Sequence, residues 1–226
     1  MLTWLQLAGG TFPTGSFNHS YGLETYIQSG RVRSAADVEA ILLAYMDVYI
    51  QTDLIFVKQA YEAIRRNDTE AIETLQSYYS ATKPASELHA ASLKTGRSLL
   101  LGVRNLYAGQ APESFGRLKD PAMMYHYALA YGLSAAIMEL PFHETAQTYM
   151  YAGLASLVSV ATRIIPLGQN ESQLVLFRLG RRLSELEIDD QELTLEKMNT
   201  FSPGLEIAPW PMKPYIPGCA CLDKQI

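Results

Sequence analysis

Residues 40–67 read AILLAYMDVYIQTDLIFVKQAYEAIRRN, and this long apolar stretch decides the class of fold. Apolar residues recur along it at helical spacing, at Ile41, Tyr45, Val48, Ile55 and Tyr61. Just before it, Ser34 and Asp37 have the spacing of a capping box, in which each side chain binds the other residue's backbone N–H. The stretch therefore predicts one long helix or two shorter ones that begin after Ser34.

The rest of the chain shows the same period, and no segment has the alternation typical of a strand. Further helices are predicted at 19–30, 69–81, 85–108, 122–140, 141–165 and 170–188, with a last short helix from 189 to about 198. Small residues in the central helices permit close approach of helix backbones: Ala90, Ala91, Ser92, Thr95, Gly96, Ala128, Ala130, Gly132, Ser134, Ala135 and Ala136. We expect an all-α, single-domain multi-helix bundle over residues 1–204, and an irregular, proline-rich tail over 205–226.

Composition restricts the class of function. The 226 residues carry a formal net charge of −5 and no strongly basic cluster, so nucleic acid is not an expected partner. The N-terminus lacks the pattern of a secretory signal, and no uninterrupted apolar run has the length of a membrane span. A cytoplasmic protein that does not contact a membrane is expected. Cys219 and Cys221 are too close together for a disulfide that would stabilise the fold.

Catalytic and metal-binding motifs are incomplete. Residues 10–15 have the glycine spacing of a phosphate loop, but Ser16 stands where the phosphate-binding lysine is needed. His143 and Glu144 begin a zinc-protease motif in which Gln147 replaces the second histidine. His89 and His126 have no histidine four residues away, and two tail cysteines do not complete a metal site. The chain is therefore not expected to be an enzyme.

The opening stretch 12–24, FPTGSFNHSYGLE, is rich in turn-forming and polar residues. Pro13 and Gly15 favour a turn, after which Ser16 or Asn18 can cap a helix that includes Gly22. Glycine inside a helix costs about 1 kcal/mol relative to alanine, so close packing against that position is expected.

Three stretches in the same order resemble the urease accessory protein UreF family. Residues 5–30, LQLAGGTFPTGSFNHSYGLETYIQSG, resemble its N-terminal signature, and residues 91–100, ASLKTGRSLL, resemble its central motif. Residues 163–173, RIIPLGQNESQ, resemble its later basic residue and the turn that follows. The resemblance extends from about residue 5 to residue 204.

The resemblance implies an all-α protein without an active site, usually a homodimer, that bridges a UreD/UreH-type accessory protein and the GTPase UreG. This assembly delivers nickel to apo-urease under GTP control, so the chain itself needs no cofactor, and nickel and GTP belong to the partner proteins. We assign the expected partner-binding surface to Phe12, Pro13, Gly15, Ser16, His19, Ser20, Gly22, Glu24, Arg97, Arg163 and Gln169. A guanidinium can bind a carboxylate through two hydrogen bonds, although Arg97 and Arg163 could also cap a helix or pair within the bundle.

The tail departs from the family pattern. After residue 208 the family continues as a polar helix that contributes to binding the UreD-type partner, whereas this chain has prolines at 209, 211, 214 and 217. Two other functions remain open: a helical enzyme or ligand-binding bundle with a buried pocket, and a structural helical dimer without a GTPase partner.

Overall fold

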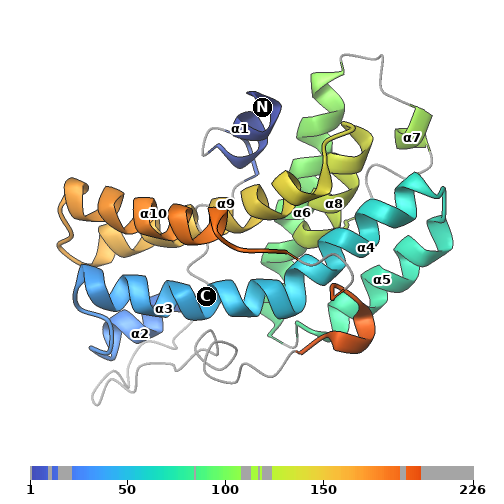
Figure 1. Ribbon diagram of the computed structural model, residues 1–226. Coiled ribbons are helices and arrows are strands. Elements are labelled where there is room, and N and C mark those ends of the chain that lie inside the picture. The colour runs from blue at the N-terminus through green and yellow to red at the C-terminus, as the bar shows by residue number, and fades with distance from the viewer. Residues whose placement is uncertain are drawn as a thin grey trace, which may run out of the picture.

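The computed structural model describes residues 2–9, 12–14, 22–83, 85–107, 113–116, 118, 124–188 and 192–199, and within these ranges it contains helices and no strand. The elements are α1 (Leu2–Ala8), α2 (Leu23–Gln28), α3 (Ala35–Val48), the π-helical segment η2 (Tyr49–Asp53), α4 (Leu54–Arg65), α5 (Thr69–Ala81), α6 (Ser86–Leu106), α7 (Glu113–Gly116), α8 (Tyr127–Ile137), α9 (Phe142–Ile164), α10 (Gln169–Ser184) and the 3-10 turn η3 (Leu195–Lys197). The all-α prediction is confirmed (Figure 1).

The apolar stretch forms one continuous helix, Ala35–Arg65, in which α3, η2 and α4 follow one another without a break. The predicted capping box begins it: the Ser34 hydroxyl accepts a hydrogen bond from the Asp37 N–H at 3.2 Å, and the Asp37 carboxylate accepts from the Ser34 N–H at 3.0 Å. Hydrogen bonds from the Arg33 backbone and the Ser34 side chain lower the pKa of Asp37. The helix is a single rod with one π-helical turn in it.

This helix is long and apolar enough to cross a membrane, judged by length and composition. Half of the most apolar 18-residue segment of this helix is buried inside the protein, however, as expected for the central helix of a helical bundle.

Helix α8 begins later than predicted, because neighbouring side chains bind the backbone before it. Residues 124–126 are not helical, and the predicted start at residue 122 is therefore wrong. The Gln76 side chain accepts a hydrogen bond from the His126 N–H at 3.0 Å, and the Ser92 hydroxyl accepts one from the Tyr127 N–H at 3.2 Å. These contacts satisfy donors that a longer helix would have paired internally.

The segment 192–199 contains only the turn η3, so the predicted helix as far as Met198 is wrong; its predicted caps Asp189 and Asp190 lie outside the described residues. The continuous helix binds the backbone of this segment instead. The Gln59 amide donates to the Leu193 carbonyl at 2.9 Å, and Thr52 donates to the Asn199 carbonyl at 3.1 Å. These bonds hold the segment along the helix.

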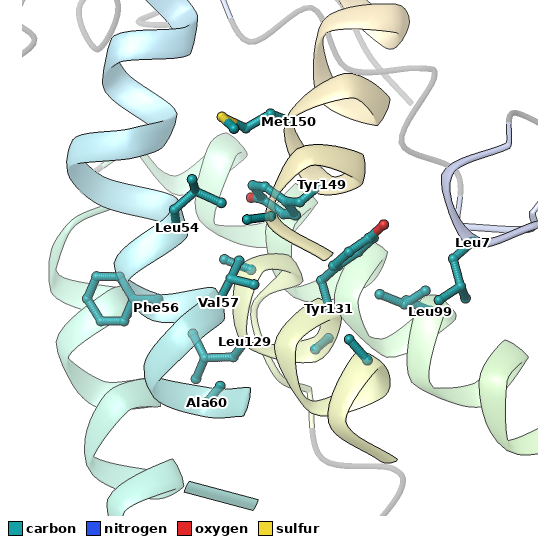
Figure 2. Packing of buried hydrophobic residues seen from close by; sticks show 14 of the residues in the cluster. Leu7, Leu54, Phe56, Val57, Ala60, Leu99, Leu129, Tyr131, Tyr149 and Met150 are labelled. Carbon is teal, nitrogen blue, oxygen red and sulfur yellow. The ribbon is translucent and has the colours of Figure 1, made fainter. Parts of the chain in front are cut away.

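The core is centred on α8, which contacts both α4 and α6 (Figure 1). A Cβ atom on Gly132 would lie 2.1 Å from the Val57 carbonyl oxygen, and one on Gly96 would lie 2.0 Å from the Tyr125 carbonyl oxygen. The predicted close approach of backbones at small residues is confirmed. Figure 2 shows Val57 and Leu129 in this core, with Tyr131 and Tyr149 beside them.

Candidate partner-binding site

The first part of the opening stretch packs on α6. Phe12 is buried, and a Cβ atom on Gly102 of α6 would lie 2.8 Å from its ring. The Phe12 N–H donates to the Gly9 carbonyl at 3.0 Å, which ties the phenylalanine to the end of α1. Pro13 is exposed. Phe12 therefore fixes this part of the chain to the helix that carries Arg97, and Pro13 lies on the surface there.

The middle of the opening stretch, with Gly15, Ser16, His19 and Ser20, lies outside the described residues. Their assignment to a partner-binding surface stays a prediction.

The stretch ends in α2, where the structure corrects the role of Gly22. The residue is not inside a helix: it is the N-cap of α2, with φ of 88°, in the left-handed region that glycine adopts without strain. Glycine is therefore required by backbone conformation rather than by helix packing. The next residue, Leu23, is fully buried, whereas Glu24 is exposed and accepts a hydrogen bond from Gln28 at 3.1 Å.

The two motif arginines are both exposed, and they lie on different helices. Arg97 is on α6, whereas Arg163 is in the last turn of α9, where its Nε donates to the Ser159 carbonyl at 3.2 Å. Gln169 is exposed as the first residue of α10. In Figure 1, α2 and the turn between α9 and α10 lie at one end of the bundle, whereas α6 lies beside α8 nearer its middle; α2 contacts α9. The predicted site residues thus form two groups, one around α6 and one around the C-terminal end of α9.

A buried carboxylate, which the sequence did not single out, joins three helical segments. Asp53 ends the π-helical turn and is 7% exposed. Its carboxylate accepts hydrogen bonds from the Tyr79 hydroxyl at 2.6 Å and the Tyr149 hydroxyl at 2.8 Å, and the Lys83 ammonium lies 3.4 Å away. Burial, followed by the negative charge of Asp53, raises the pKa of Tyr149, so this phenol stays a donor. Apolar residues lie three and four positions before and after Asp53, at Tyr49, Ile50, Phe56 and Val57, and this placement on the apolar side of the helix is the signal that could have identified the cluster.

His126 lies beside this cluster and is fully buried. One ring nitrogen, Nε2, is 2.9 Å from the Ser80 hydroxyl, and Nδ1 has no hydrogen-bond partner among the described residues. Burial, with smaller contributions from the charges of His89 and Lys83, lowers the pKa of His126 to about 4. The imidazole is therefore neutral at physiological pH.

These polar groups have the properties of a structural cluster. The donors around Asp53 already occupy both carboxylate oxygens. In the part of the chain that the structure describes, no three His, Cys, Asp or Glu side chains come together as a metal site, and Cys219 and Cys221 lie outside that part.

A shallow groove lies between α9 and α10. It is lined by Tyr151, Gln173, Leu176, Phe177, Gly180, Arg181 and Ser184. Phe177 is 63% exposed and Tyr151 is 41% exposed. This groove on the outside of the protein combines exposed aromatic side chains with the polar residues Gln173, Arg181 and Ser184.

Comparison with known proteins shows which family this sequence resembles. The family described as UreF matches residues 32–180. The chain is 31% identical over 214 residues to a urease accessory protein UreF of Bacillus sp. (strain TB-90), with 92% of each chain covered. It is 31% identical over 210 residues to that of Lachnoclostridium phytofermentans, again with 92% of each chain covered, and 30% identical over 192 residues to that of Sporosarcina pasteurii, covering 82% of this chain and 93% of the relative.

Proposed function

Because this chain belongs to the UreF family of urease accessory proteins, we propose that it acts in urease maturation by binding other proteins rather than by catalysing a reaction. In this proposal it bridges a UreD/UreH-type accessory protein and the GTPase UreG, and it regulates the GTP-dependent delivery of nickel to apo-urease. GTP and nickel are bound by the partners, and the assembly works in the cytoplasm.

The observation that carries this proposal is the exposure of both motif arginines. Arg97 and Arg163 lie on the surface, so their guanidinium groups are accessible to carboxylates of a partner. The alternative of a ligand-binding bundle has its best candidate in the Asp53 cluster. That cluster is buried and its carboxylate is already hydrogen-bonded, which favours a role in stabilising the fold.

The proposal includes a homodimer, and the groove between α9 and α10 supplies a face for it. Exposed apolar side chains such as Phe177 and Tyr151 favour association, since burying them removes apolar surface from water. Sedimentation analysis of Phe177→Glu should show a monomer where the unmodified protein is a dimer.

The experiment that tests the function is co-expression of the chain with the other proteins of a urease operon. We expect a tagged chain to co-purify with the UreD/UreH-type protein and with UreG, and nickel-dependent urease activity to require the chain. The isolated chain should not bind GTP in isothermal titration. A chain that co-purifies with neither protein, or micromolar GTP binding by the chain alone, would contradict the proposal. Because the tail departs from the family pattern, a second chain with a family-like C-terminus is tested in parallel.

A further inference from the structure

Three cations occupy one face of α6. Lys94, Arg97 and Arg104 follow one another at intervals of three and seven residues, which places them on the same side of an α-helix. Lys94 and Arg104 are ten residues apart, which is about 15 Å along the helix. We call these three residues the α6 basic face. Leu101 lies among them and is half-buried.

The opposite side of α6 fixes the direction of this face. Its buried residues, among them Thr95, Gly96 and Leu99, face the bundle, and the helix contacts α8. At Gly96 the backbones approach so closely that a Cβ atom would lie 2.0 Å from the Tyr125 carbonyl oxygen. This contact leaves α6 little freedom to rotate about its axis, so all three cations remain directed outward, and all three are exposed.

Among the described residues, no hydrogen bond or ion pair to the side chain of Lys94, Arg97 or Arg104 occurs. Some cations on other helices are paired: Arg66 contacts Glu62 on α4 at 3.1 Å, and Arg178 of α10 contacts Glu39 of α3 at 2.9 Å.

The single acidic residue of helix α6, Glu87, lies seven residues before Lys94, farther away than the three or four residues that bring helix side chains into contact. Like charges three or four residues apart slightly destabilise a helix, and here they occur in a chain whose net charge is −5.

From this arrangement we propose that the α6 basic face is a docking surface for an acidic protein surface of a maturation partner. The proposal rests on the proposed function and adds two residues: Lys94, which lies in the central motif but was not assigned to the site, and Arg104, which lies outside the motif. Three outward cations over about 15 Å complement a row of carboxylates on a helix or an extended segment, and Leu101 provides an apolar contact between them. The α6 basic face shares Arg97 with the predicted site, and Phe12 packs on Gly102 of the same helix.

The test is the charge reversal of the two new residues, Lys94→Glu with Arg104→Glu, in the full-length chain. Affinity is measured separately for the purified UreD/UreH-type protein and the purified GTPase, at low and moderate NaCl. We expect the variant to bind one of them at least about tenfold more weakly, and to lose most of the salt dependence that the unmodified chain shows with that partner.

The control is Arg66→Glu with Arg182→Glu, which makes the same change of charge at exposed positions and, at Arg66, also removes the ion pair with Glu62. Arg66, Arg104 and Arg182 all lie at the C-terminal end of a helix, so the cost from the helix dipole is comparable. The control should bind both partners normally, and thermal unfolding should show both variants folded.

Unchanged affinity of the folded variant for both partners would overturn the α6 proposal and leave the proposed function standing. Failure of the unmodified chain to bind either partner would overturn the proposed function, and the docking proposal with it. Loss of binding to phosphatidylglycerol vesicles or duplex DNA, without loss of partner binding, would also overturn the proposal, because the face would then serve a membrane or a nucleic acid.

Discussion

Gly132 of α8 lies against the backbone of Val57 in α4, so close that a Cβ atom would be 2.1 Å from the Val57 carbonyl oxygen. The contact is with backbone, which cannot move aside as the end of a side chain can. The two central helices are therefore held at a separation that only glycine permits.

Gly132→Ala is expected to lower the free energy of unfolding by about 3 kcal/mol, because the added methyl group forces α8 away from α4. Urea denaturation measures the change. The matched control is Gly180→Ala in α10, where a Cβ atom would lie 3.9 Å from Tyr151, an ordinary contact. Alanine should stabilise that helix by up to about 1 kcal/mol. Equal effects of the two substitutions would contradict the close packing of α4 and α8.

Asp53→Ala is expected to destabilise the protein by about 3 kcal/mol, since it leaves two buried hydroxyls and the Lys83 ammonium without their acceptor. The comparison is Asp47→Ala, at an exposed position on the same continuous helix, which should change stability by less than about 0.5 kcal/mol. Chemical denaturation of both variants tests this prediction. Equal losses of unfolding free energy in the two variants would contradict it.

The free energy of unfolding should decrease as the pH is lowered from about 6.5 to 4, because of His126. Its pKa in the folded protein is about 4, below the ordinary value of 6.5, so in this range the unfolded chain binds more protons than the folded one. Protonation of the unfolded state therefore lowers the free energy of unfolding by up to about 3 kcal/mol. This loss is negligible above pH 7 and nearly complete at pH 4.

The measurement is the pH dependence of the unfolding free energy in His126→Gln and in His143→Gln, where His143 is an exposed histidine. The first variant should lose part of the slope between pH 6.5 and 4, and the second should keep it. The slope is the diagnostic quantity, because His126→Gln can also lower stability at every pH.

His19→Ala combined with Glu24→Lys should weaken assembly with the GTPase and lower urease activation while the fold stays intact. Glu24 is exposed, and Gln28 is its recorded side-chain partner, so little stability depends on it. Reversing a charge in an interface can cost several kcal/mol of binding. Co-purification, urease activity and thermal unfolding are measured on the same variant.

Glu70→Lys is the control for that experiment, because Glu70 is exposed in the first turn of α5 just as Glu24 is in the first turn of α2. Both changes place a cation at a helix N-terminus at a similar small cost. Normal assembly of the double variant would refute the docking role. Equal loss of folding and assembly would indicate a structural one.

Local features of the sequence predicted local structure well. The capping box at Ser34 and the helical spacing that follows it depend on residues three or four apart, so they can be read from the chain alone. The start of α8 could not be read in this way, because it depends on side chains of Gln76 and Ser92, which are distant in sequence. For the same reason the contact of Asp53 with Tyr149, 96 residues later, could not be predicted.

The candidate site was predicted in part. The motifs identified Arg97 and Arg163, but only the structure shows that they lie on different helices, α6 and α9. The structure also shows that Lys94 and Arg104 are exposed on the same side of α6 as Arg97. Gly22 was recognised as unusual, although its left-handed backbone depends on a turn that composition does not specify.

The π-helical turn at Tyr49–Asp53 joins the two halves of the long helix. A π turn holds one residue more than the α-helix needs, and each residue advances the helix by about 100°. The turn thus takes up its extra residue locally, so the side of α3 that contacts α9 and α10 keeps its orientation relative to the side of α4 that contacts α8 and α5. Deleting one codon within this turn would leave a regular α-helix whose two halves keep nearly the same relative rotation. The same deletion within α3 or α4 would instead rotate one half of the core against the other by about 100°. In a gene, the π turn is therefore the place on this helix where the smallest in-frame deletion preserves the packing partners.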